Sequence, residues 1–369
     1  MNVQLLWKRK EAASPPEEAV PSVSTRREML KDLAVLPVLG LAGWGASRSR
    51  ALYGFDSLSG ATVQLNRVAL GELKGELPKG KLGNHELTRL IMGGNLIANN
   101  AHARDLSYVN SLFKAYNTEK KVFETLILCE QAGINSIAVG DGIALNSKIL
   151  NKYKSLTGSK IKVIHYLYIN ENIENNCEKL KKTIDLGSEI IIVQGVGADL
   201  LVQNNRLEVI EEMLNRIRSN GFEAGLGAHA IDTLVTCEEN GIIPDFYFKT
   251  MHHDNYWSAH PRENRTKFEF LGHTKLSSLT KDHNQWYENV FDTYPDRTVE
   301  FINRAQVPVI GFKVLAAGAI QPQDGFKYAF ENGADFICVG MFDFQLVNDV
   351  NICIETLQNL QNRKRAWFA

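Results

Sequence analysis

Two lysines lie inside apolar segments that have the composition of buried β-strands. Lys249 lies in the segment 245–250 (DFYFKT), and Lys313 lies in the segment 309–318 (VIGFKVLAAG). A charged amine is costly to bury unless it is paired or used. Burial and a second nearby cation both lower the pKa of a lysine, and a neutral amine is a nucleophile. If the two side chains meet in one site, these positions predict amine chemistry.

A repeating unit of helix, glycine and apolar strand positions these lysines. It is clearest at 132–139, 186–193, 240–248 and 332–339. A glycine after a helix favours the left-handed conformation that ends the helix. The apolar runs do not alternate with polar residues, which is typical of parallel strands that are buried on both faces. The sequence therefore predicts successive βα units.

Eight strands are predicted in this way, at 90–95, 136–140, 162–167, 190–194, 223–229, 246–250, 309–315 and 336–340. Helices are predicted between them, the clearest at 119–132, 172–186, 207–220, 323–332 and 350–361. Eight βα units in about 280 residues predict an α/β fold, a closed (β/α)8 TIM barrel. An open doubly wound sheet is the alternative, but no GxGxxG pattern follows the first strand.

Three parts of the chain differ in composition. Residues 1–52 form a leader, predicted to be disordered over 1–24, and residues 53–84 form a linker with a short hairpin at 61–82 that caps the barrel bottom. Residues 85–369 form the barrel, with a long insertion at 251–295 that is rich in His, Trp, Tyr and Asn. Long loops in compact domains are usually functional.

The leader resembles a twin-arginine export signal. Arg26 and Arg27 precede an apolar run at 33–43, which is too short and too interrupted by Pro37 and glycines to be a good membrane span. The resemblance implies the export machinery as a partner and a periplasmic or otherwise extracytoplasmic location, with membrane contact only through an uncleaved leader. A cytoplasmic protein is the alternative.

Overall charge argues against nucleic-acid binding, and the cysteine pattern argues against a disulfide-bonded fold. Lys and Arg number 41 and Asp and Glu number 42, so the net charge of −1 gives no electrostatic basis for binding nucleic acid. The five cysteines form no CxxC pair, and Cys129, Cys338 and Cys353 fall in apolar stretches. We therefore expect buried thiols and no disulfide framework.

Polar residues cluster where the predicted strands end, and the active site of such a barrel gathers at these ends. The predicted catalytic residues are Lys249, Lys313, His229 and Asp141. The predicted substrate-binding residues are Asn95, Gln194, His252, His253, Tyr256 and Trp257. His165 lies inside its strand, where a satisfied core histidine is as good an interpretation as a functional one. Tyr256 and Trp257 either stack on a sugar or pack within their loop.

The sixth and seventh strands resemble those of class I aldolases of the deoxyribose-phosphate type. The matching residues are Phe248-Lys249-Thr250 and Gly311-Phe312-Lys313-Val314, and the segment 333–340 resembles the last strand of that family. The resemblance implies that Lys249 forms a Schiff base and that Lys313 lowers its pKa. Ala317 and Gly318 stand where the family has a phosphate-binding glycine pair, and Asp343 would repel phosphate. A non-phosphorylated substrate is therefore expected.

The segment 82–94 has a fainter resemblance to the opening of the aldo/keto reductase barrel. No catalytic tyrosine in the context of that family follows the second strand. The resemblance therefore implies a shared barrel entry rather than a nicotinamide cofactor.

Three functions compete at this stage. The first is an exported lyase or aldolase that acts on a non-phosphorylated sugar or keto-sugar through a lysine Schiff base and requires no cofactor. The second is an epimerase, isomerase or lyase that uses a divalent metal held by His165, His229 and His253. The third is a carbohydrate-binding or aldo/keto reductase-like barrel, with Tyr256, Trp257 and Trp286 as a stacking platform.

Overall fold

The structure is a computed structural model that describes residues 70–100, 108–140, 145–256, 259–265, 267–268 and 292–369. The chain divides into two units, Met1–Ser59 and Gly60–Ala369, and every described residue belongs to the second. The predicted export leader, Asp141, Trp257 and Trp286 lie outside the described residues. Among the described helices, none is long and apolar enough to cross a membrane.

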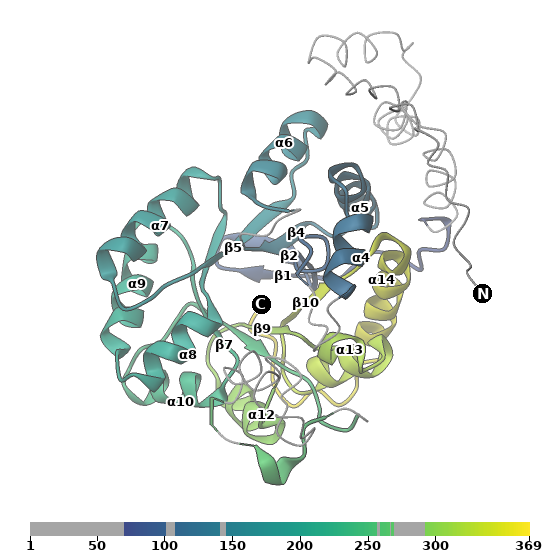
Figure 1. Cartoon of the computed structure of the whole chain (residues 1–369). Helices are drawn as coiled ribbons and strands as arrows, with labels where there is room; N and C mark the ends of the chain where they lie inside the picture. The colour runs from purple at the N-terminus through teal and green to yellow at the C-terminus, as the bar shows by residue number, and fades with distance from the viewer. Residues whose placement is uncertain (1–69, 101–107, 141–144, 257–258, 266, 269–291) are drawn as a thin grey trace, which may run out of the picture. The chain divides into compact units, whose positions relative to one another are not determined.

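Eight parallel strands close a barrel in the order β10-β3-β4-β5-β6-β7-β8-β9, which confirms the predicted (β/α)8 fold (Figure 1). The strands are β3 (Leu90–Gly93), β4 (Ser136–Val139), β5 (Lys162–Leu167), β6 (Ile190–Val193), β7 (Ala224–Ala228), β8 (Phe246–Thr250), β9 (Val309–Phe312) and β10 (Phe336–Gly340).

Helices surround these strands. They are α4 (Tyr108–Tyr116), α5 (Glu119–Gln131), α6 (Ser147–Thr157), α7 (Ile173–Asp185), α8 (Gly195–Gln203), α9 (Leu207–Ser219), α10 (Ile231–Glu239), α12 (Pro295–Arg304), α13 (Pro322–Glu331) and α14 (Asp343–Gln358), with 3-10 turns η1 (Arg262–Asn264) and η4 (Ala316–Gly318). The last helix begins earlier than the predicted 350–361. Its first turn is polar and aromatic rather than apolar, and for this reason the apolar pattern did not predict it.

Local sequence signals set the ends of these helices. Asn146 caps α6 by accepting hydrogen bonds from the backbone N–H groups of Lys148 and Ile149, and the left-handed Gly158 ends the same helix. The glycines predicted to end helices all have positive φ angles: Gly133, Gly187, Gly241 and Gly333. These glycines explain why the connection from each of these four helices to the next strand is short.

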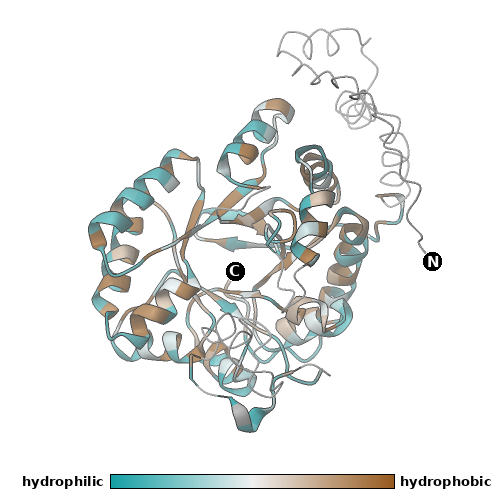
Figure 2. Ribbon diagram, in the orientation of Figure 1, coloured by the Kyte–Doolittle hydropathy of each residue, from teal (hydrophilic) through white to brown (hydrophobic). Residues whose placement is uncertain are grey.

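The barrel has two apolar layers that follow the two-residue alternation of its strands. Ile91, Ile164, Phe246 and Phe336 pack inside the barrel, whereas Tyr247 packs with the helices outside it. Figure 2 shows the apolar helix faces turned towards the strands and the polar faces turned outwards. Whether a strand residue faces the interior or the helices is therefore decided by its position in this alternation.

The N-terminal hairpin lies later in the chain than predicted. It consists of β1 (Lys79–Leu82) and β2 (His85–Thr88), not 61–82, and its turn includes Gly83 with a φ of +56°. Leu82 and Leu87 are buried and pack with the barrel interior. This hairpin therefore packs against the barrel interior, whereas the part of the predicted hairpin before residue 70 lies outside the described residues.

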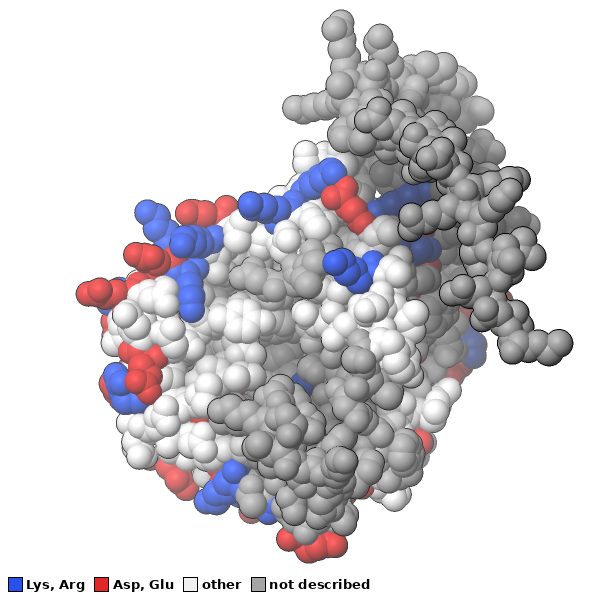
Figure 3. Space-filling view, in the orientation of Figure 1, with Lys and Arg blue, Asp and Glu red and all other residues white. Residues whose placement is uncertain are grey.

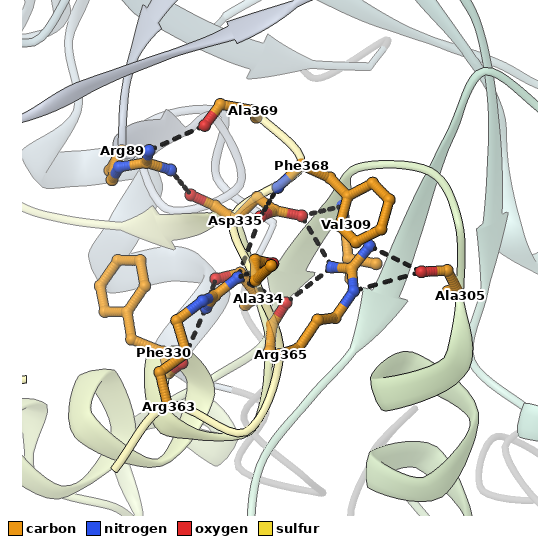
Figure 4. Close-up of polar contacts among 12 residues, drawn as sticks. Arg89, Ala305, Val309, Phe330, Ala334, Asp335, Arg363, Arg365, Phe368 and Ala369 are labelled. Atoms are coloured by element: carbon orange, nitrogen blue, oxygen red, sulfur yellow. Dashed lines mark hydrogen bonds and ion pairs between the residues drawn. The ribbon is translucent and has the colours of Figure 1, made fainter. Parts of the chain in front are cut away.

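The last residues of the chain are held at Asp335, just before β10 (Figure 4). The Asp335 carboxylate accepts hydrogen bonds from Arg363 at 3.0 Å, from Arg365 at 2.8 Å and from the backbone N–H groups of Val309 and Phe368. All three charged side chains are at most 8% exposed. A buried carboxylate with four donors links β9, β10 and the C-terminal segment.

We predict that Asp335→Ala lowers the free energy of unfolding by about 3–5 kcal/mol, because it leaves two guanidinium groups buried without their carboxylate. Urea denaturation at pH 7 measures this change. The control is Glu212→Ala, which breaks the exposed pair with Arg216 on α9 and should change stability by less than about 1 kcal/mol. Equal effects of the two substitutions would contradict the anchoring role of Asp335.

Candidate functional site

A cavity of about 660 Å³ lies where the barrel strands end. Its polar lining consists of amide, hydroxyl and amine groups together with one imidazole: Asn95, Asn99, Asn100, Asn110, Ser111, Gln194, Lys114, Lys313, Tyr166, Tyr168 and His229. Phe248 and Phe312 supply aromatic surface. Four of the predicted site residues therefore line one cavity, namely Asn95, Gln194, His229 and Lys313. In the view of Figure 3, charged side chains of the described residues gather mainly around the outer rim.

The strand alternation keeps two other predicted residues out of the cavity. Phe248 on β8 and Tyr166 on β5 pack with the barrel interior and line the cavity. Their neighbours Lys249 and His165 therefore point to the opposite side, towards the helices. Lys249 and His165 were predicted from strand position without this alternation, and Tyr166 and Phe248 were not predicted for the same reason.

Lys249 is fully buried, and the groups around its amine are oxygen atoms. Its Nζ donates to the carbonyl oxygen of His229 at 2.8 Å, to the carbonyl oxygen and Oγ1 of Thr250 at 2.9 and 2.5 Å, and to Asp292 Oδ1 at 3.2 Å. Burial lowers the pKa of Lys249, and the adjacent Asp292 carboxylate opposes this shift. A ring of acceptors fits an ammonium, which is not a nucleophile.

The partner of Lys249 is itself held by the ends of the long insertion. Asp292 accepts a hydrogen bond from Thr298 at 2.7 Å, and its backbone N–H donates to His252 Nε2 at 2.9 Å. The other ring nitrogen of His252 lies 2.7 Å from the His253 carbonyl oxygen, and burial lowers the pKa of His252 to about 3. His252 is therefore neutral and structural, joining the start of the insertion to its end.

These contacts correct the expected placement of Lys249 and His252. A Schiff-base amine must be reached by a carbonyl carbon, whereas the amine of Lys249 lies on the helix side of β8 and is bound to Asp292. His252 likewise lies outside the cavity lining. The Lys249 amine instead holds the backbone at His229, just after β7, and His252 holds Asp292.

The three histidines of the metal alternative do not come together. The ring nitrogens of His165 lie 2.6 Å from Ser147 Oγ and 2.6 Å from Ser188 Oγ, so both are used on the helix side of β5. His253 accepts a hydrogen bond from the Asn255 backbone and contacts the Tyr328 ring at 5.4 Å. Within the described part of the chain, no three His, Cys, Asp or Glu side chains are grouped to bind a metal ion.

Tyr256 also lies away from the cavity. Its ring packs edge-on against His252, with 5.7 Å between the ring centroids, and it is not among the lining residues. Of the two interpretations of this residue, packing within the loop is the one that its contacts support.

Lys313 enters the cavity because the backbone leaves the strand at this residue. Strand β9 ends at Phe312 rather than at the predicted residue 315, and Lys313 has a left-handed φ of +55°. Phe312 faces the barrel interior, so a continued strand would turn Lys313 towards the helices. The left-handed backbone costs on the order of 1–2 kcal/mol for a non-glycine residue. Strain at such a position is a reason to suspect function.

The amine of Lys313 has the properties that were expected of Lys249. Its side chain is half-buried and lines the cavity, and burial lowers its pKa from 10.5 to about 7. A large share of this amine is therefore neutral at physiological pH, with burial as the cause.

His229 forms a buried pair with Asp199, a residue of α8 that sequence analysis missed. Asp199 Oδ2 lies 3.0 Å from His229 Nδ1 and also accepts the His229 backbone N–H at 3.0 Å, while Thr233 donates to Oδ1 at 2.5 Å. Burial raises the pKa of Asp199 to about 7, against these hydrogen bonds. The pair fixes the orientation of the imidazole and directs its other nitrogen, Nε2, away from Asp199.

Close packing brings this imidazole beside the wall that carries Lys313. A Cβ atom on Gly195 would lie 2.9 Å from His229 Nδ1, so only glycine leaves room for the ring. Phe312 contacts His229 edge-on at 5.4 Å and stacks on Phe248 at 4.4 Å. His229 and Lys313 therefore belong to neighbouring parts of one cavity wall.

No protein-family model matches the chain, and no curated protein matches it either. A solved structure similar to it is a putative aldo-keto reductase from Pseudomonas aeruginosa, with a TM-score of 0.52 and 13% identity over 78% of this chain and 98% of that chain. A mandelate oxidase has a TM-score of 0.43 and 11% identity, over 92% of this chain and 94% of that chain. The flavin-binding domain of baker's yeast flavocytochrome b2 has a TM-score of 0.42 and 10% identity, over 92% of this chain and 86% of that chain. At these identities, the likeness establishes the barrel fold alone.

We predict that Lys249→Met lowers the free energy of unfolding by about 3–5 kcal/mol, because it leaves the Asp292 carboxylate buried without its cation. The double variant Lys249→Met/Asp292→Asn removes that charge and should recover a large part of the loss. Urea denaturation of both variants measures the coupling. A single variant within 1 kcal/mol of the unsubstituted protein would show that the pair contributes little.

The lowered pKa of Lys313 predicts a stability that depends on pH. Between about pH 7 and 10.5, the unfolded state binds a proton at this lysine that the folded state does not bind. Stability relative to Lys313→Met must therefore rise with pH in this window, and the cost of the lysine is largest below pH 7. Urea denaturation at pH 7, 8.5 and 9.5 tests this, with exposed Lys120→Met as the control. A constant difference between the two proteins would refute it.

Proposed function

We propose that this barrel is a lyase that cleaves a hydroxylated carbonyl compound, such as a non-phosphorylated keto-sugar, through a Schiff base on Lys313. The observation that carries the proposal is a lysine turned into a polar cavity by a left-handed backbone, with a pKa of about 7. An amine with that pKa combines a useful neutral fraction with good nucleophilicity.

The reaction begins when the neutral Lys313 amine attacks the substrate carbonyl carbon. Loss of water gives an iminium, which draws electrons from the adjacent carbon–carbon bond. As that bond breaks, the proton of the substrate hydroxyl passes to His229 Nε2, and an aldehyde leaves. The protonated imidazole then returns its proton to the enamine carbon. Water finally hydrolyses the iminium, which releases the second carbonyl fragment and restores the amine.

Polar residues in and beside the cavity have separate tasks in this scheme. Asp199 holds Nδ1 of His229 and stabilises the imidazolium that forms during the proton transfer. The amides of Asn95 and Gln194 are suited to bind substrate hydroxyl groups. Gln194 also accepts a hydrogen bond from the backbone of Gly197 and so caps α8. Lys249 acts as a positioning residue, because it donates to the His229 carbonyl oxygen.

The leader adds a proposal about location. Arg26 and Arg27 support export by the twin-arginine route, and a phosphorylated sugar would seldom be met outside the cytoplasm. A neutral or carboxylated keto-sugar fits that setting. The lyase proposal itself rests on the cavity and does not require export.

We predict that borohydride reduction in the presence of a small ketone attaches the ketone irreversibly to Lys313. The probe is hydroxyacetone or dihydroxyacetone at pH 7.5, and peptide mapping by mass spectrometry locates the added mass. Lys313→Met should lose this label. Lys249→Met, checked for folding by circular dichroism, should keep it, because that amine does not line the cavity.

Two further results complete the test. His229→Gln should still be labelled but should cleave keto-sugars at least about 100-fold more slowly, since general acid–base catalysis contributes roughly that factor or more. A label on Lys249 would restore the original assignment of the nucleophile. Absence of label on any lysine, with NADPH-dependent reduction of the same ketones, would replace the lyase by a carbonyl reductase.

A further inference from the structure

Among the described residues, the charged groups that line the cavity have one sign. Among the described lining residues, Lys114 and Lys313 carry the ionisable amines, and none is Asp or Glu. The other polar groups next to Lys114 are neutral donors, such as Asn110 and Ser111. A cavity with low-dielectric walls and cations of one sign attracts anionic ligands.

Lys114 lies on the exposed helix α4, and its side chain lines the cavity. Asn110, Ser111 and Lys114 lie on one face of α4 at helical spacing and line the cavity. On the same helix, Phe113 contacts Phe342 edge-on, with the ring centroids 5.1 Å apart. This contact joins α4 to the residue that precedes α14.

A second argument comes from the charge that develops during the reaction. Formation of an iminium on Lys313 creates a fixed cation in a half-buried site, and burial already disfavours the charged form of this amine. A negative group on the bound substrate would compensate this charge in every turnover. Such a group would also interact with Lys114 at the other charged point of the cavity.

We infer that the substrate carries a carboxylate, which Lys114 and the adjacent amide of Asn110 bind while the keto group reaches Lys313. The substrate class is a hydroxylated oxo acid, that is, a keto-sugar acid. This inference rests on the proposed Schiff-base function for the position of the carbonyl. It goes beyond that function because it assigns a binding role to Lys114 and a charge to the substrate.

The test compares two three-carbon ketones, pyruvate and the neutral hydroxyacetone, as competitors for borohydride labelling of Lys313. Pyruvate should label at least about tenfold better at low salt, and high salt should reduce this preference. Lys114→Met should remove the preference, because it should weaken labelling by pyruvate far more than labelling by hydroxyacetone. Lys114→Arg should retain it, because the charge remains. The exposed Lys120→Met is the matched control for loss of one surface charge and should behave like the unsubstituted protein.

The outcomes separate this inference from the proposed function. Equal labelling by both ketones, with no effect of Lys114→Met, would overturn the carboxylate and leave the Schiff base intact. If neither ketone labels Lys313, the Schiff base fails, and calorimetry then decides the carboxylate alone. In that case, gluconate binding that exceeds sorbitol binding and is lost in Lys114→Met would support the anion site. Equal or absent binding of the two polyols would reject it.

Discussion

Every strand of the barrel sends alternate side chains to the interior and to the helices, and the chemistry of the cavity depends on this constraint. Tyr166 and Phe248 face inwards, so His165 and Lys249 face outwards. A one-residue shift of either strand would exchange these pairs and alter the cavity completely. The barrel register therefore determines which titratable groups a substrate meets and which become part of the packing between strands and helices.

The side chains that face the helices also support the cavity, because they hold the backbone that carries the side chains facing the interior. Lys249 joins the His229 carbonyl oxygen to Asp292, and Asp292 in turn is held by His252 and Thr298. These contacts bring the two ends of the insertion to the same point at the end of β8. A buried ion pair of this kind adds little net stability, but breaking it by removing one partner is costly, so it defines a single arrangement.

Lys313 shows the reverse case, in which the alternation is broken. The left-handed residues Lys313, Ala316 and Ala317 end β9 early and redirect the chain into η4. Such backbone is unfavourable for residues that have a Cβ atom, and burial of an amine adds a further cost. Both costs fall at Lys313, whose amine lines the cavity, which is the pattern expected when stability is exchanged for reactivity.

The sequence by itself determined the fold, because the glycine that ends a helix and the apolar strand that follows it are local signals. It also located Asn95, Gln194, His229 and Lys313, since the ends of barrel strands meet at one face whatever their side chains are. The assignment of Lys249 required more than a short motif, because direction within a strand depends on register against both neighbours. Asp199 and Lys114 lie on helices, and their distance from the cavity follows from helix rotation and packing. The left-handed turn at Lys313 is likewise a tertiary effect, imposed by long-range contacts on a residue whose own preference is for a continued strand.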